Sequence, residues 1–173
     1  MNEYFFDTGV SVSTDFIDSI KEYIAQSKES DWKIVLQMTL LLLPVELFKT
    51  SPELMKIITK FGAENRLAVY KTAPNTSYHW HKDISRFTCL NVLLDGYDSL
   101  CLFAQPPDQG MMYDMQKLDY QPNRVYLLNV TQLHSVINFS TERHLLSIGV
   151  PPPTRFDDVQ SFIETEILDK KTK

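Results

Sequence analysis

The middle of the chain is a succession of short β-prone runs, and this constrains the fold more than any other feature of the sequence. Between residues 66 and 150, apolar and β-branched runs recur roughly every ten residues. Turn-forming residues such as Pro74-Asn75 and Asp95-Gly96 separate them. The predicted strands are 66–72, 78–81, 87–94, 99–105, 111–118, 124–129, 134–139 and 143–150. Eight strands at this spacing indicate a mainly β protein with a closed or double-sheet core, such as a jelly roll.

Helical patterns flank this β region. A capping hydroxyl at Ser13 or Thr14 begins an amphipathic helix whose apolar residues recur at helical spacing. Ser51 and Pro52 begin a second helix, because they supply a capping hydroxyl and a proline at the first helical position. Gly62 ends that helix.

The whole chain is expected to form a single domain. Its parts would be a helical N-terminal region (1–65), a β core (66–150) and a C-terminal helix within 151–173, where an apolar stripe covers 155–170. The stretch 32–48 is ambiguous between strand and helix.

Charge and composition narrow the classes of partner. The chain carries 17 Lys and Arg against 22 Asp and Glu, a net charge of −5, which disfavours a nucleic-acid partner. Its most apolar segment, 34–48, is interrupted too soon to span a membrane, and the start of the chain lacks the pattern of a signal peptide. Cys89 and Cys101 lie in apolar runs without CxxC spacing, as expected of free thiols in a reducing compartment. We therefore expect a cytoplasmic protein.

The segment YHWHKD, residues 78–83, holds three possible metal ligands. Side chains alternate between the faces of a strand, so His79, His81 and Asp83 are expected to share one face. His134 opens a predicted strand 51 residues after Asp83, and Arg143 opens the next one. Two imidazoles and one carboxylate on adjacent strands can bind Fe(II) on one triangular face and leave the opposite positions open.

A hairpin formed by the last two predicted strands would bring the arginine to the same interior. With a four-residue loop, Asn138 would pair with Arg143 and His134 with Ser147, whereas a three-residue loop would point Arg143 outward. With the four-residue loop, Arg143 would lie about 13 Å along its strand from the level of His134. A five-carbon dicarboxylate and an extended arginine would fill that gap, with the guanidinium binding the far carboxylate.

The segments YHWHKDISRFTCLNVLLDG and RVYLLNVTQLHSVINFSTERHLLSIGV resemble the 2-oxoglutarate- and Fe(II)-dependent oxygenases, in particular small aspartyl/asparaginyl or prolyl hydroxylase-like members of phage and marine microbial type. The resemblance implies a double-stranded β-helix, with His81, Asp83 and His134 as iron ligands and Arg143 as the 2-oxoglutarate clamp. It implies that dioxygen is used to hydroxylate an amino acid, a peptide or a small metabolite, with succinate and CO2 as co-products. Aspartyl hydroxylases of this type lack the metal carboxylate, so Asp83 argues against an aspartyl substrate.

Further polar residues are candidates for contacts to 2-oxoglutarate. Asn138 would share the His134 face, although a strand asparagine satisfied by the backbone is an equal alternative. Asn91 and Tyr70 are candidates because a buried β interior rarely holds polar groups without partners. Ser147, on the expected Arg143 face, would share the carboxylate bound there.

Residues near the ligands are candidates for the substrate mouth. Tyr78, Trp80 and Arg86 flank the metal strand, although packing is the stronger expectation for Trp80. The run 111–113 is either a mobile lid or a strand with flexible core residues.

Two other interpretations stay open. One is a cupin-type metal centre of His79, His81 and His134 that works without 2-oxoglutarate, which leaves Asp83 and Arg143 unexplained. The other is a non-catalytic β-barrel that serves as a binding module, which predicts no metal binding.

Overall fold

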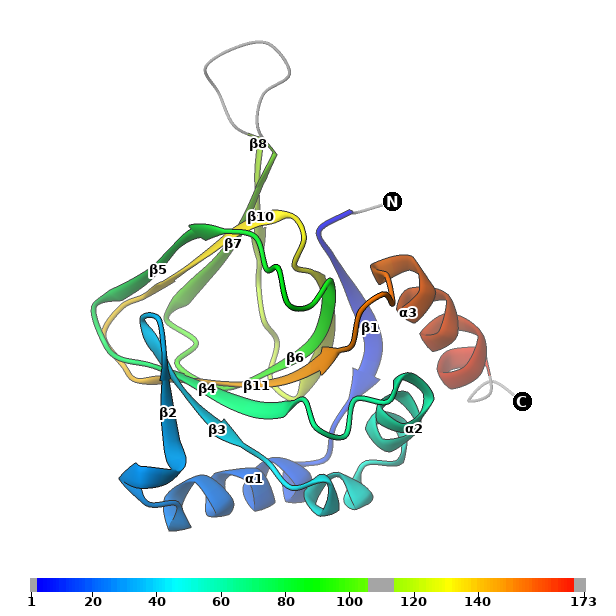
Figure 1. Ribbon diagram of the computed structural model, residues 1–173, viewed down its shortest axis with the longest axis horizontal. Helices are drawn as coiled ribbons and strands as arrows, with labels where there is room; N and C mark the ends of the chain where they lie inside the picture. The colour runs from blue at the N-terminus through cyan, green and yellow to red at the C-terminus, as the bar shows by residue number, and fades with distance from the viewer. Residues whose placement is uncertain (1–2, 106–113, 170–173) are drawn as a thin grey trace.

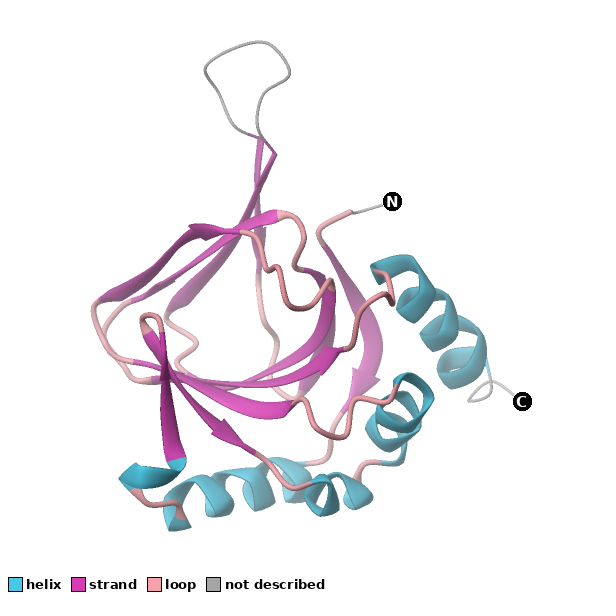
Figure 2. Cartoon of the chain, viewed as in Figure 1, coloured by secondary structure: helices cyan, strands magenta, loops and turns pink. Residues whose placement is uncertain are grey.

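The computed structural model describes residues 3–105 and 114–169 (Figure 1). Its strands form two antiparallel sheets, one of seven strands in the order β1-β9-β6-β11-β4-β3-β2 and one of four in the order β5-β10-β7-β8 (Figure 2). The strands are β1 (Phe5–Ser11), β2 (Trp32–Val35), β3 (Met38–Leu42), β4 (Leu67–Thr72), β5 (Thr76–His81), β6 (Thr88–Asp95), β7 (Ser99–Gln105), β8 (Asp114–Leu118), β9 (Arg124–Asn129), β10 (Leu133–Asn138) and β11 (Arg143–Val150).

Helices cover the outer face of the larger sheet, as Figure 1 shows. They are α1 (Thr14–Gln26), α2 (Pro52–Phe61) and α3 (Phe156–Phe162), which continues into the π-helical turn η3 (Ile163–Leu168); η1 (Glu29–Asp31) and η2 (Val45–Thr50) are short 3-10 turns. Two predicted boundaries are confirmed: the Ser13 hydroxyl accepts from the Phe16 N–H, and Gly62 adopts a left-handed conformation. Pro52 begins α2 as predicted, but the Ser51 hydroxyl makes no capping hydrogen bond, so that part of the prediction is wrong. No helix within the described ranges is both long and apolar enough to cross a membrane.

The larger sheet separates a packed core from an interior cavity. On β6, Leu90 and Val92 belong to the core cluster shared with the helices, whereas Cys89 and Asn91 line the cavity on the opposite face. This is the period-two alternation of a strand that is buried on both sides. It explains why β6 reads as an almost continuous apolar run and yet places a polar Asn91 inside the molecule.

The prediction of a mostly helical region 1–65 is wrong in part, because that region also contributes β1, β2 and β3 to the larger sheet. The register of β1 against β9 shifts between Asp7 and Ser11, and Gly9 within it has a positive φ of 70°. Burial alternates from Asp7 to Ser11, but one of the two buried positions is the polar Thr8, so no apolar alternation marks this strand in the sequence. The eight strands predicted between 66 and 150 are confirmed, the fifth from Asp114 onward, since 111–113 lie outside the described residues.

The predicted hairpin between the last two strands is wrong. β10 pairs with β5 and β7 in the smaller sheet, whereas β11 pairs with β4 and β6 in the larger one. The four intervening residues therefore cross between sheets, and Asp98 stabilises the crossing by accepting hydrogen bonds from the Ser140 backbone N–H and the Thr141 hydroxyl. A four-residue loop suits a hairpin and a crossing equally well, so its length could not distinguish them.

Gly96, which directly follows β6, allows the chain to pass close to the start of β11. A Cβ at this position would lie 2.6 Å from the Arg143 Cα, and the Gly96 φ is +76°. We expect Gly96→Ala to lower the free energy of unfolding by about 2 kcal/mol or more, because backbone atoms cannot move aside as a flexible side chain can. Urea denaturation measures this.

Gly62→Ala is the matched control. The φ of Gly62 is +63°, but nothing lies within 4 Å of the added Cβ. The free energy of unfolding of this variant should therefore fall by only about 1 kcal/mol. Equal losses in the two variants would show that the close approach at Gly96 is unimportant.

Candidate functional site

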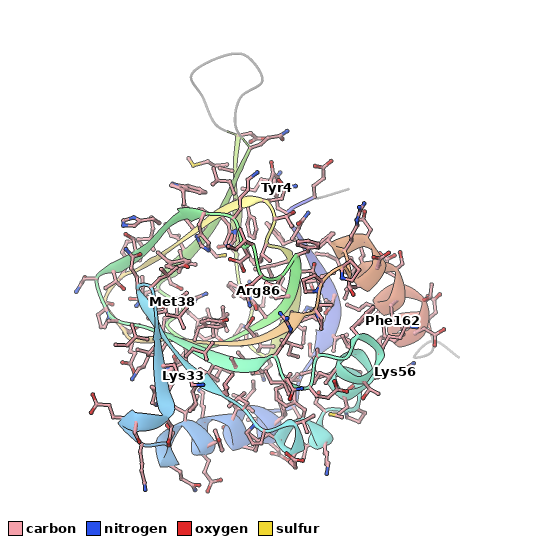
Figure 3. The ribbon with its side chains drawn as sticks, in the orientation of Figure 1. Tyr4, Lys33, Met38, Lys56, Arg86 and Phe162 are labelled. Carbon is pink, nitrogen blue, oxygen red and sulfur yellow. The ribbon has the colours of Figure 1, made fainter. Side chains whose placement is uncertain are left out.

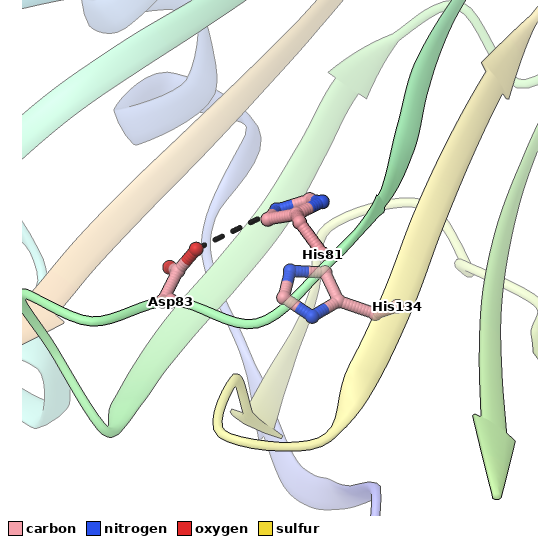
Figure 4. A group of neighbouring side chains, drawn as sticks. All are labelled: His81, Asp83 and His134. Atoms are coloured by element: carbon pink, nitrogen blue, oxygen red, sulfur yellow. Dashed lines mark ion pairs between the residues drawn. The ribbon is translucent and has the colours of Figure 1, made fainter. Parts of the chain in front are cut away.

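Three side chains with metal-ligating atoms converge between the sheets. His81 at the end of β5 lies directly opposite His134 on β10. Asp83 follows two residues later, in a loop held by a 2.8 Å hydrogen bond from its own N–H to the Val130 carbonyl. One ligand atom from each of the three lies within 4.8 Å of the others (Figure 4).

A bulge in β5 determines which histidine of this strand faces the cluster of metal-ligating atoms. Tyr78 is opposite Val136 and His81 is opposite His134, so β5 uses three steps where β10 uses two. The extra residue puts Tyr78 and His81 on one face, with ring centroids 4.1 Å apart, and leaves His79 exposed. The expectation that His79 shares the inner face is therefore wrong, and a cupin-type centre that includes His79 loses its geometric basis.

Both histidines are oriented by the backbone. His81 Nδ1 lies 2.7 Å from the His79 carbonyl, and His134 Nδ1 lies 2.9 Å from the Gln132 carbonyl. A carbonyl oxygen can only accept, so each Nδ1 carries the proton and donates. In the neutral form of each ring the lone pair is therefore on Nε2, and this is the form in which imidazole binds a metal.

The local electrostatics keep His134 and Asp83 in the protonation states that bind a metal. Burial lowers the pKa of His134 to about 4, so this imidazole is neutral near pH 7. Burial alone would raise the pKa of Asp83, but the adjacent His81, the charge of Arg86 and the hydrogen bond that the Arg86 Nε donates bring it down to about 2. The aspartate is therefore a carboxylate at the same pH.

The lowered pKa of His134 predicts a pH dependence of stability in the metal-free protein. The unfolded chain takes up the His134 proton near pH 6.5 and the folded chain only near pH 4. The free energy of unfolding should therefore fall as the pH drops from 6.5 toward 4. Urea titrations across this range measure the slope, and His134→Gln should flatten it; an unchanged slope in that variant would refute the assignment.

The three side chains line a cavity of about 480 Å³ between the two sheets. Leu36 and Ile84 line it too and are 77% and 93% exposed. The exposed Arg66 and Lys82 are also among the lining residues, so the mouth combines apolar and basic side chains. Tyr78 and Arg86 also line the cavity, as predicted, and Figure 3 shows Arg86 inside the ring of strands. Trp80 is 42% exposed and is not among the lining residues.

Arg143 lines the same cavity although it is only 1% exposed. Its Nε donates to the Ser99 hydroxyl over 3.0 Å, and its Cζ lies 5.9 Å from the centre of the Tyr120 ring. Its Nη2 is buried without a hydrogen-bond partner, and no carboxylate of residues 3–105 and 114–169 forms an ion pair with it. A buried cation without a counter-charge is costly, so the position suits an anionic ligand.

The other predicted contact residues divide into two groups. Asn91 and Tyr70 line the cavity, and the Asn91 Oδ1, like the Arg143 Nη2, is buried without a hydrogen-bond partner among the described residues. Asn138 does not line the cavity: its Nδ2 donates to the carbonyls of Thr72, Ala73 and Thr141, whereas its Oδ1 is buried without a hydrogen-bond partner among the described residues. Ser147 accepts from Arg86 instead of sharing a ligand with Arg143.

Tyr120 is a cavity residue that sequence reasoning missed. Its hydroxyl accepts from the Asn91 Nδ2 at 3.4 Å, and burial raises its pKa well above the usual value. It follows β8 immediately before the predicted turn at 121–123, where no strand period assigns it to a face. The candidate lid at 111–113 lies outside the described residues.

No protein-family model matches the chain, and no curated protein matches it in sequence. Solved structures match in fold. A prolyl-4-hydroxylase from Pseudomonas putida superimposes with a TM-score of 0.63 at 10% identity, over 88% of this chain and 95% of that one.

Two further structures give similar matches. A Trichoplax adhaerens prolyl hydroxylase in complex with a peptide fragment of the hypoxia inducible factor oxygen degradation domain has a TM-score of 0.62 at 10% identity, over 94% of this chain and 87% of that one. HygX from Streptomyces hygroscopicus, with nickel and 2-oxoglutarate bound, has a TM-score of 0.58 at 10% identity, over 88% of this chain and 85% of that one. The chain therefore has the double-stranded β-helix fold of these proteins, which confirms the predicted fold class.

Proposed function

We propose that this protein is a non-haem oxygenase that uses Fe(II) and 2-oxoglutarate, with dioxygen, to hydroxylate an amino acid, a peptide or another small metabolite. One observation carries the proposal: the unpaired, buried guanidinium of Arg143 lies in the same cavity as His81, Asp83 and His134. A metal site alone would not need this cation. A ligand that is anionic at one end and chelating at the other accounts for both features.

The donor set suits ferrous iron. Two imidazole nitrogens and one carboxylate oxygen are the ligands of the facial triad, which leaves further coordination positions free. His81, Asp83 and His134 would hold the ion, and Arg143 would bind the distal carboxylate of 2-oxoglutarate. When bound, iron and 2-oxoglutarate supply the activation of dioxygen and the oxidation of the substrate.

The protein supplies binding and orientation. Backbone carbonyls hold the two imidazoles with Nε2 toward the shared point, and Tyr120 and Asn91 present polar groups close to Arg143. Buried Cys89, Cys101 and Leu128 line the same cavity and keep water away from the reacting groups. The mouth, lined by apolar and basic side chains, would admit the substrate.

A thermal-shift comparison of three small acids tests this function. With Mn(II) in place of iron, 2-oxoglutarate should raise the Tm strongly, because it engages both the metal and Arg143. Glutarate lacks the keto oxygen, and pyruvate lacks the distal carboxylate, so each should raise the Tm much less. A 2-oxoglutarate effect that is equal with and without Mn(II) would contradict the proposal.

A further inference from the structure

Arg86 is tied to one oxygen of Asp83. Its Nε donates to the Asp83 Oδ2 over 2.6 Å, and its Nη1 donates to the buried Ser147 hydroxyl over 3.1 Å. The guanidinium carbon lies 5.4 Å from the centre of the Tyr70 ring. The loop after β5, strand β11 and strand β4 thus all fix its position.

The two oxygens of Asp83 therefore have different surroundings. Oδ2 faces the guanidinium, whereas Oδ1 lies 3.5 Å from the His81 Nε2, the nitrogen that is free to bind a metal. An ion held by both oxygens would have to share Oδ2 with a short, charge-assisted hydrogen bond and approach the positive guanidinium. Oδ1 is consequently the oxygen that completes the triad.

We propose that Arg86 is a positioning residue that restricts Asp83 to a single metal-ligating oxygen. The inference rests on the proposed function, because it concerns the same ion. In a six-coordinate site, three protein donors leave about three positions for other ligands. Carboxylates also bind metals through both oxygens, which would occupy one more position. Chelation by the keto acid and binding of dioxygen together need three open positions, so Arg86 preserves the one that a two-oxygen aspartate would take.

Counting the water molecules on bound Mn(II) tests this role without any turnover. Broadening of the Mn(II) EPR lines in 17O-enriched water reports how many exchangeable waters are bound. The wild-type protein should hold about three waters, and Arg86→Gln about one fewer, because Asp83 is then free to bind through both oxygens. Arg86→Met is a second variant, which keeps an unbranched stem beside Tyr70 but has no donor, and the same loss is expected.

The control is Arg124→Gln. Arg124 also pairs with an aspartate, Asp7, at 2.8 Å, and it does not line the cavity. Its water count should equal that of the wild type. An unchanged count in a folded Arg86→Gln or Arg86→Met protein overturns the role of Arg86, as does loss of Mn(II) binding in both variants, which would show that Arg86 builds the site as a whole.

The outcomes separate this inference from the proposed function. If the wild-type protein binds Mn(II) but not 2-oxoglutarate, the proposed function fails, while the water count still decides the role of Arg86. If the wild-type protein binds no Mn(II), both are overturned. If 2-oxoglutarate binds and the number of bound waters is the same in the wild type and the Arg86 variants, the proposed function is supported and the role of Arg86 is overturned.

Discussion

Arg143→Met is expected to weaken 2-oxoglutarate binding to the metal-loaded protein by about 30-fold or more, with little change in Fe(II) affinity. Truncating one partner of a buried charge pair costs about 2–5 kcal/mol, and each 1.4 kcal/mol is a factor of ten in affinity. The ion is held by other residues and should be retained. Anaerobic calorimetry gives the two affinities separately.

The stability of the same variant gives an independent check. Without a ligand, Arg143 is a buried cation with an unsatisfied Nη2. Methionine removes that charge at similar length, so the ligand-free variant should be at least as stable as the wild type in urea. Arg124→Met serves as the control for loss of an arginine at a partly exposed position. A variant that binds 2-oxoglutarate normally would show that the anion site lies elsewhere.

His134→Ala should lower the affinity for divalent metal by more than about 100-fold and abolish iron-dependent release of succinate. Loss of residues that merely orient a ligand already reduces metal affinity by about 10–100-fold, and His134 supplies a ligand atom itself. Calorimetry with Mn(II) measures the affinity.

His79→Ala is the matched control, since it removes an exposed imidazole two residues from His81. The His79 carbonyl that accepts from His81 belongs to the backbone and is kept. This variant should bind metal like the wild type. A loss as large as that of His134→Ala would restore His79 to the metal centre.

Sequence reasoning found the strands because local signals define them. Turn residues such as Asp95-Gly96 stand between apolar runs, and each run is long enough to show its period. It failed for β1, which no apolar alternation marks, and for the pairing of β10 and β11, which depends on distant partners. Strand existence is a local property, whereas sheet order is decided by packing across the whole chain.

The candidate site divides in the same way. The His-x-Asp spacing and the distal His134 and Arg143 identified the four residues that share the cavity, although the hairpin used to justify Arg143 does not exist. The bulge that excludes His79 and the bond between Arg86 and Asp83 were not predictable, because both arise from three-dimensional contacts that no spacing encodes.

The most direct test of the account is anaerobic addition of Fe(II) and then 2-oxoglutarate to the metal-free wild-type protein, followed by visible absorption. We predict a metal-to-ligand charge-transfer band that saturates at one equivalent of each and needs both. The band should be lost in His134→Ala and should require far more 2-oxoglutarate in Arg143→Met. A protein that binds Fe(II) tightly but shows no band at saturating 2-oxoglutarate would contradict the central claim that His81, Asp83, His134 and Arg143 form one site.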